Sequence, residues 1–322
     1  MGDFRDAVVA AWQIGGSGRQ WQPSELSREL PAEPLWLHLD RAAPGLEEWL
    51  QRVALVPEAA VSGLLDEDTR PRMEIYGDGV MLILRGVNAT DGQGHHEMVS
   101  LRLWITPRCL ITLRKRSLSS IRAVRQRYEE GRGAQHIGAL LLALIENLNA
   151  PMDRVTDAIE AAFDARENVS GERHVRHAMT AVSRQRSKLV TLRRYIHPQQ
   201  VALTKLLAAQ PEWLSERDGA MLRNLVDDVA RQVEDLAALT ERATLLHDQL
   251  SHQLAERLNR NMYLLSMVTV IFMPLTAVTG LLGVNLGGIP GAAHPLAFEI
   301  LCGLLVALMA LEFWLFRRFH LL

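Results

Sequence analysis

Two long apolar runs stand out in the last quarter of the chain. Residues 262–282 and 296–316 are each 21 residues long. The first run has no charged residue, and the second has Glu299 and Glu312 towards its ends. A helix of this length reaches about 31 Å, which is enough to cross the hydrocarbon core of a bilayer. The pattern predicts a two-helix transmembrane hairpin, because both runs are too long and too apolar for the core of a soluble domain.

The first third of the chain has short apolar runs, separated by turn residues such as Gly77–Asp78–Gly79 and Pro107–Arg108. Such runs are typical of strands in a cytosolic α/β domain, which we assign to residues 1–116. The expected strands are 7–14, 35–39, 72–76, 79–88, 97–106 and 109–114, and the expected helices between them are 44–53 and 57–66.

From residue 117 onward apolar residues recur every three or four positions, which predicts helices. We assign 117–214 to a cytosolic helical region punctuated by Pro198 and Pro211. No proline occurs from Ser215 to Pro274, so one helix about 100 Å long can join the cytosol to the first span. The expected fold is an α+β membrane protein with a long stalk helix continuous with its first transmembrane helix. The remaining segments are a stalk at 215–261, a first span at 262–282, a periplasmic loop at 283–295, a second span at 296–316 and a basic tail at 317–322.

Basic residues set the orientation of the hairpin. Arg257 and Arg260 precede the first span, Arg317 and Arg318 follow the second, and the loop 283–295 has no Lys or Arg. The positive-inside rule therefore places both termini in the cytoplasm. The N-terminus has no signal-peptide pattern. The net charge of −2 argues against a nucleic-acid partner, and two distant cysteines indicate no disulfide framework.

The stalk and first span carry a polar pattern with a seven-residue repeat, which defines one narrow helix face. Its cytosolic part, the acidic stripe, consists of Asp227, Glu234, Glu241 and Asp248. Its continuation, the polar ladder, consists of Asn259, Met262, Ser266, Thr269, Met273, Thr276 and Gly280. Carboxylates on a cytosolic helix often only face solvent, and small or hydroxyl residues in a span often serve helix packing or bond to their own helix. The continuity of this face favours a pore: several copies around an axis would turn each position into a ring that attracts cations.

The first span ends in a turn without charged residues, TGLLGVNLGGIPG, at residues 279–291. Its glycines permit close backbone approach and positive φ. In a ring of copies, Asn285 would offer neutral carbonyl oxygens at the outer mouth, which hold a hydrated cation and still release it.

Gly283-Val284-Asn285 at the end of the first of two C-terminal spans, after so long a stalk, resembles the CorA-type divalent-cation transporter superfamily. Val284 and a loop without acid resemble its zinc branch, ZntB, since the magnesium branch usually has Met there and an acidic loop. The resemblance implies a homopentamer in the bacterial inner membrane, surrounded by lipid, with the first span lining the pore. It further implies that Asn285 forms the outer selectivity site, that Asp248 lies in a cytosolic funnel, and that Asn259, Met262, Thr269, Met273 and Thr276 line the channel.

Histidines are the other candidates for metal contact. His174 and His177 share a helix face, although exposed histidines on an arginine-rich helix are commonly ordinary surface residues. His247, Asp248 and His252 lie near the expected funnel, and His294 lies in the outer loop. A transport pathway must release its ion, so we expect no closed tetrahedral site.

The transported ion is expected to be a divalent cation, with zinc first, and no other cofactor is implied. The zinc branch implies uptake coupled to protons, with efflux as the alternative direction. Another hypothesis within the family is a magnesium, cobalt or nickel channel gated by intracellular ion. A third, from another class, is a cytosolic sensor or scaffold whose hairpin is only an anchor. No nucleophile–base pair or dinucleotide motif suggests an enzyme.

Overall fold

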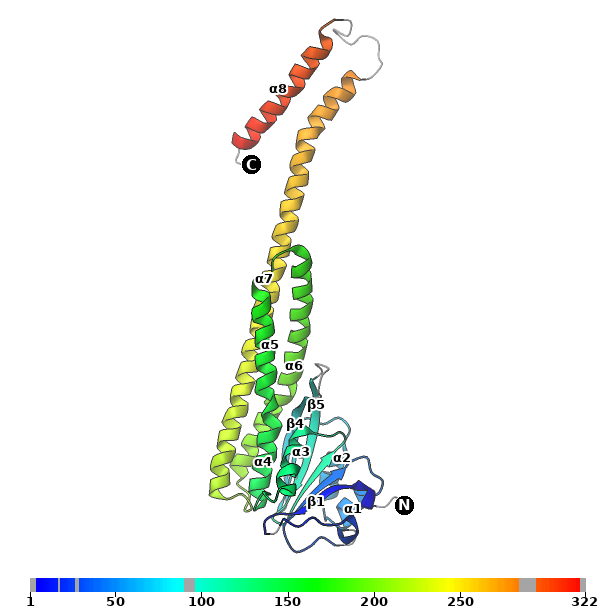
Figure 1. Cartoon of the computed structure of the whole chain (residues 1–322), viewed down its shortest axis with the longest axis vertical. Coiled ribbons are helices and arrows are strands. Elements are labelled where there is room, and N and C mark those ends of the chain that lie inside the picture. The colour runs from blue at the N-terminus through cyan, green and yellow to red at the C-terminus, as the bar shows by residue number, and fades with distance from the viewer. Residues whose placement is uncertain (1–3, 17, 27–28, 90–95, 284–293, 319–322) are drawn as a thin grey trace. The chain divides into compact units, whose positions relative to one another are not determined.

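The computed structural model describes residues 4–16, 18–26, 29–89, 96–283 and 294–318 (Figure 1). The chain divides into two compact units. The first contains Met1–Val169 and His177–Asp248, and the second contains Ser170–Arg176 and Gln249–Leu322.

A six-stranded sheet forms the centre of the N-terminal part of the first unit. Its strands are β1 (Val8–Gln13), β2 (Leu35–Asp40), β3 (Arg72–Tyr76), β4 (Gly79–Ala89), β5 (His96–Ile105) and β6 (Cys109–Arg114). Their spatial order is β1-β2-β6-β5-β4-β3; β2 pairs with β6 in parallel, and the other pairings are antiparallel. All six expected strands are confirmed, each to within one residue at either end.

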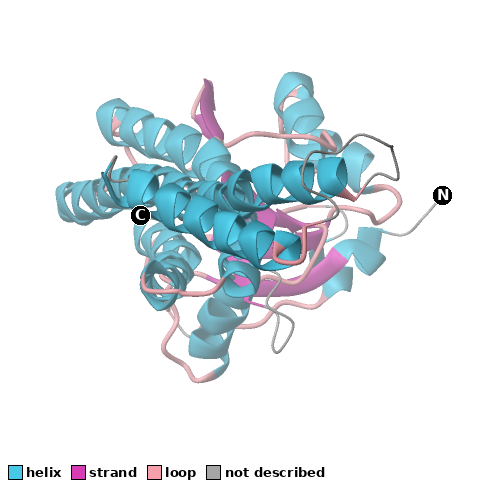
Figure 2. Ribbon diagram, turned by 90° about the horizontal axis from the view of Figure 1, so that it is seen from above, coloured by secondary structure: helices cyan, strands magenta, loops and turns pink. Residues whose placement is uncertain are grey.

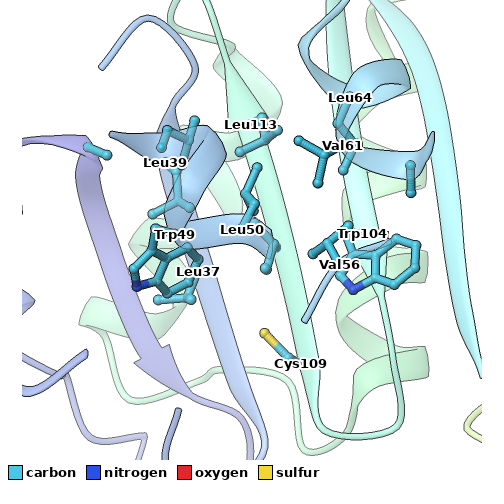
Figure 3. Close-up of a cluster of buried hydrophobic side chains, with 14 of the residues drawn as sticks. Leu37, Leu39, Trp49, Leu50, Val56, Val61, Leu64, Trp104, Cys109 and Leu113 are labelled. Carbon is cyan, nitrogen blue, oxygen red and sulfur yellow. The ribbon is translucent and has the colours of Figure 1, made fainter. Parts of the chain in front are cut away.

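Both faces of the sheet are covered, which explains why its strands are almost continuously apolar. On one face, α1 (Leu46–Arg52) and α2 (Glu58–Leu65) pack over Leu37, Leu39 and Trp104 in a buried cluster (Figure 3). On the other face lies α3 (Ser119–Glu129), whose Tyr128 ring is centred 5.2 Å from that of Trp36. Both helices expected before residue 67 are therefore present. Two short 3-10 helices, Phe4–Ala7 and Pro23–Leu26, complete this part.

Three helices follow, α4 (Ile137–Asn149), α5 (Pro151–Glu167) and α6 (Glu172–Ala209), which are labelled in Figure 1. Figure 2 distinguishes the helices, in cyan, from the strands of the sheet, in magenta. The expectation that Pro198 interrupts the helix is wrong, because α6 continues through it. Its neighbour Gln199 is fully buried, accepts from the Arg85 backbone N–H at 2.7 Å and donates to Asn149 Oδ1 at 2.8 Å. These bonds hold the helix in place where proline removes a backbone bond. Pro211 does follow a helix end, after Gln210 with φ of 39°.

The stalk and first span form one helix, α7 (Glu216–Leu282), of 67 residues. Its start is fixed by a reciprocal cap, in which Ser215 Oγ accepts from the Asp218 N–H and Asp218 Oδ2 accepts from the Ser215 N–H. The second apolar run forms α8 (Ala297–Arg318). Both helices are long and apolar enough to cross a membrane, and none of their apolar windows is buried within the chain. The predicted fold class is confirmed.

Candidate ion pathway

In the first unit, α7 has a packed side and an exposed side. The packed side, here called the apolar seam, repeats every seven residues and is almost fully buried. It consists of Leu222, Val229, Leu236 and Ala243 in the first unit, and the repeat continues to Leu250 at the start of the second unit. Each residue of the acidic stripe lies two positions before a seam residue, which is about 200° around a helix. The acidic stripe is exposed, so its carboxylates lie on the side of α7 opposite to the packed one.

Polar contacts to α5 fix the rotation of α7 in this unit. Gln232 donates to Asp153 Oδ1 at 2.9 Å, and Arg242 donates to the carboxylates of Asp164 and Glu167. Gln232 is buried and Arg242 is half-buried. Because both side chains reach towards α5, the acidic stripe points away from the bundle that carries it.

In the second unit, every residue of the polar ladder is exposed in the single chain. Met262 and Met273 have 66% and 65% of their surface accessible. Met267, Ile271 and Val278 are among the half-buried positions of this span. Ile271 and Val278 continue the seven-residue repeat of the apolar seam. Met267 continues the parallel repeat that contains the buried Leu246. One chain therefore encloses no pathway along the ladder in the part that the structure describes.

The threonine hydroxyls of the ladder bond to their own helix, as one of the alternatives had anticipated. Thr269 Oγ1 donates to Leu265 O at 2.9 Å, and Thr276 Oγ1 donates to Phe272 O at 2.7 Å. A hydroxyl has a single proton, so this bond leaves the oxygen lone pairs free to accept. The side chains are thus fixed as acceptors, the form in which they can contact a cation or its hydration water.

Of the segment 279–291 at the end of the first span, the structure describes residues 279–283. The Gly283 N–H donates to Thr279 O at 2.9 Å, and a Cβ on Gly283 would approach that carbonyl to 3.0 Å. A Cβ on Gly280 would meet no atom within 4 Å among the described residues beyond its own helix backbone, so no described neighbour requires glycine there. Val284 and Asn285 lie outside the described residues.

The candidate histidines do not form a metal centre within the described part of one chain. There, no group of three or more His, Cys, Asp or Glu side chains has a geometry that could hold a metal ion. His174 and His177 are both exposed on α6, His252 is exposed on α7, and His294 is exposed and accepts from the Leu296 N–H at 3.2 Å. His247 Nδ1 lies 3.8 Å from Asp248 Oδ1. Their roles as ligands remain predictions.

A sheet domain joined by one continuous helix to an apolar span, and then to a second span, is the architecture of a class of membrane transporter. The chain belongs to the family described as CorA-like Mg2+ transporter protein, whose model matches residues 31–318. The predicted family is therefore confirmed, and the chain is a member of a divalent-cation transporter family rather than an enzyme family.

Individual relatives are similar over nearly the whole chain. A divalent cation transporter, CmaX, from Pseudomonas aeruginosa is 35% identical over 297 residues, which is 90% of this chain and 88% of CmaX. A zinc transport protein, ZntB, from Pectobacterium carotovorum is 31% identical over 312 residues, which is 97% of this chain and 95% of ZntB. The solved structure of full-length CmaX aligns with a TM-score of 0.80 at 32% identity, covering 98% of each chain.

Proposed function

We propose that this chain assembles as a homopentamer in the bacterial inner membrane, with both termini in the cytoplasm, and carries divalent cations along a central pathway. The observation that carries the proposal is the position of the polar ladder and the acidic stripe. Both are exposed and in the register opposite the packed side of α7. If each copy turns this side to a common axis, every position becomes a ring of oxygen or sulfur atoms.

The chemistry of these rings changes along the pathway. Carboxylates of the acidic stripe would concentrate cations at the cytosolic end. Hydroxyl and thioether groups follow in the span, and Asn285 would form a neutral ring at the outer mouth. Neutral oxygens bind a hydrated cation weakly enough for release, which conduction requires.

Zinc is the cation that we assign first. Val284 and the absence of acid in the loop 283–295 support it, as do relatives that are named zinc transport proteins. Uptake is the direction that we propose, because an inside-negative potential favours entry of a divalent cation by about 4.6 kcal/mol per 100 mV. Coupling to protons needs a titratable group, and the polar ladder has none, so His252, Asp248 or His294 would supply it.

Zinc flux into liposomes tests the proposal. The purified protein is reconstituted around a zinc-sensitive dye, with or without an inward proton gradient and with excess magnesium as competitor. We expect zinc entry that rises with the gradient, persists in magnesium and is lost in Asn285→Ala. As the control for assembly, the Asn285→Ala variant should have the same oligomeric state in micelles as the unmodified protein.

The second candidate function is a channel for magnesium, cobalt or nickel. The family description, CorA-like Mg2+ transporter protein, supports magnesium, and the name of CmaX specifies no particular divalent cation. Flux that ignores the proton gradient and is blocked by magnesium would favour this candidate. Absence of flux from folded, oligomeric protein would instead favour a membrane-anchored sensor or scaffold.

A further inference from the structure

A small cavity in the first unit is lined by arginines and lies outside the proposed pathway. It has a volume of about 110 Å³ and lies beside the last residues of β2 and β6 and the start of α3. Its polar lining consists of His38, Arg114, Ser117, Arg122 and Arg125, and we call it the arginine cavity. The strands β2 and β6 are parallel, and the crevice at the carboxyl ends of parallel strands is where α/β sheets commonly bind ligands.

Positive charge in the arginine cavity is not balanced by its own lining, which contains no carboxylate. In the part of the chain that the structure describes, Arg114 and Arg122 form no ion pair with a carboxylate; Arg122 donates to Ser117 Oγ at 3.4 Å. Arg125 pairs through Nε with Glu129 at 3.0 Å on the same helix. Three guanidinium groups around so small a space repel one another, and an anion between them would relieve that repulsion.

His38 adds a hydrogen-bond acceptor to this basic lining. We assign the single proton of Thr112 Oγ1 to its bond with Leu37 O at 3.1 Å, so that this oxygen accepts from Trp36 Nε1 at 3.1 Å and from His38 Nδ1 at 2.9 Å. Burial, together with the charges of Arg114 and Arg125, lowers the pKa of His38 to about 3. The ring is therefore neutral with its proton on Nδ1, and Nε2 carries a lone pair.

The ring of His38 lines the arginine cavity and is only 2% exposed. A group bound in the cavity can therefore donate a hydrogen bond to its acceptor nitrogen. The lining thus combines several N–H donors with one acceptor.

We propose that the arginine cavity binds a phosphate group. Hydrogen phosphate has oxygens that accept from the three guanidinium groups, and it has one O–H that donates to His38 Nε2. Sulfate lacks that O–H and would leave Nε2 unpaired. The cavity is small, with a volume of about 110 Å³, which suits a single tetrahedral oxyanion.

Titration calorimetry on the full-length protein in micelles tests this, with inorganic phosphate, sulfate and chloride at equal ionic strength near neutral pH. We expect phosphate to bind more tightly than sulfate, and chloride to give no saturable heat. Arg122→Gln should weaken phosphate binding by about tenfold or more, because it removes charge-assisted hydrogen bonds. Arg122→Lys should restore part of the affinity. Arg127→Gln, which removes an exposed arginine of the same helix outside the lining, should leave binding unchanged.

His38→Asn tests the acceptor. Asparagine can keep a donor towards Thr112 but has nothing at the Nε2 position, so we expect phosphate and sulfate to bind equally in this variant. Equal binding of the two ions by the unmodified protein, or equal losses in Arg122→Gln and Arg127→Gln, would overturn the proposal.

A second titration distinguishes whether the cavity binds a free phosphate ion or the phosphate group of a larger molecule. Glycerol 3-phosphate is titrated beside inorganic phosphate. Tighter binding of inorganic phosphate assigns the cavity to the free ion, and tighter binding of glycerol 3-phosphate assigns it to a monoester. Binding of neither would refute the site, whatever the outcome of the zinc-flux experiment.

Discussion

Gly79 lies where the backbone of the sheet passes directly over a buried tryptophan ring. It begins β4 after the Gly77–Asp78 turn, and a Cβ at this position would lie 2.2 Å from Cζ2 and 2.4 Å from Cη2 of Trp104. Trp104 is only 3% exposed and lies in the buried cluster (Figure 3). The Tyr76 ring is centred 6.3 Å from the Trp104 ring. A methyl group on residue 79 would clash with the Trp104 ring, so Gly79→Ala should overpack the core and destabilise the domain by about 1–3 kcal/mol.

A double-mutant cycle isolates this clash. Trp104→Phe removes the indole atoms that the new methyl group would touch, at the cost of a cavity of its own. We therefore expect the double variant to be more stable than the two single changes predict, by about 1–2 kcal/mol.

Circular dichroism of the full-length protein, heated at one fixed rate, measures the change as a shift of apparent Tm. For a domain of this size about 1 kcal/mol corresponds to roughly 2–4 °C. Gly219→Ala is the matched control: a Cβ there meets nothing within 4 Å, and alanine in helix α7 should be neutral or stabilising by up to about 1 kcal/mol. Additive effects in the cycle, or a Gly79→Ala variant as stable as the parent, would refute the reasoning.

Three further predictions concern single side chains. Thr276→Val removes an acceptor oxygen of the polar ladder and should lower zinc flux by about tenfold. Thr279→Val is the control, because Thr279 also bonds to its own helix but lies off the ladder, and flux should be nearly unchanged in this variant. Burial raises the pKa of the Cys109 thiol to about 12, so folded Cys302→Ser protein should resist iodoacetamide at neutral pH and react only after denaturation; rapid labelling of folded protein would contradict this. The pKa of His38 is about 3 in the folded chain, against an ordinary value of 6.5. As the pH falls below 6.5, the unfolded state therefore binds a proton at His38 while the folded state does not. This difference should lower the free energy of unfolding by up to about 2 kcal/mol at pH 5. Comparison of acid unfolding between parent and His38→Asn checks that sign, since the variant should lose less stability over the same range.

The sequence predicted the strands and the long helix because each depends on local pattern. Alternating and continuous apolar runs located the six strands, and the absence of proline before Pro274 indicated the length of α7. Pairing is not local, however. Nothing in the pattern indicated that β2 lies beside β6, a partner more than 70 residues away, or that the pair is parallel.

The prediction at Pro198 failed for a related reason. Local rules count the hydrogen bond that proline removes, but they do not include the tertiary bonds of Gln199 to Arg85 and Asn149. Those bonds involve β4 and α4, which are distant in sequence, and they keep α6 continuous.

The candidate sites also differ in whether local sequence pattern or the tertiary fold brings their residues together. The sevenfold spacing of the acidic stripe and polar ladder is visible in sequence, because one helix carries all of it. The arginine cavity was missed, although Arg114, Arg122 and Arg125 beside an expected helix start were a signal. Its acceptor, His38, comes from a strand whose position only the folded sheet reveals.

Cysteine accessibility in the first span is the most direct test of the central claim, that cations pass along the polar ladder. Zinc flux is measured in Cys302→Ser protein carrying either Thr269→Cys, on the ladder, or Ile271→Cys, about 200° away around the helix. A small cationic thiol reagent is then added. The account predicts that flux through Thr269→Cys is blocked and that flux through Ile271→Cys continues. Block of Ile271→Cys with Thr269→Cys unaffected, or equal block of both, would contradict it.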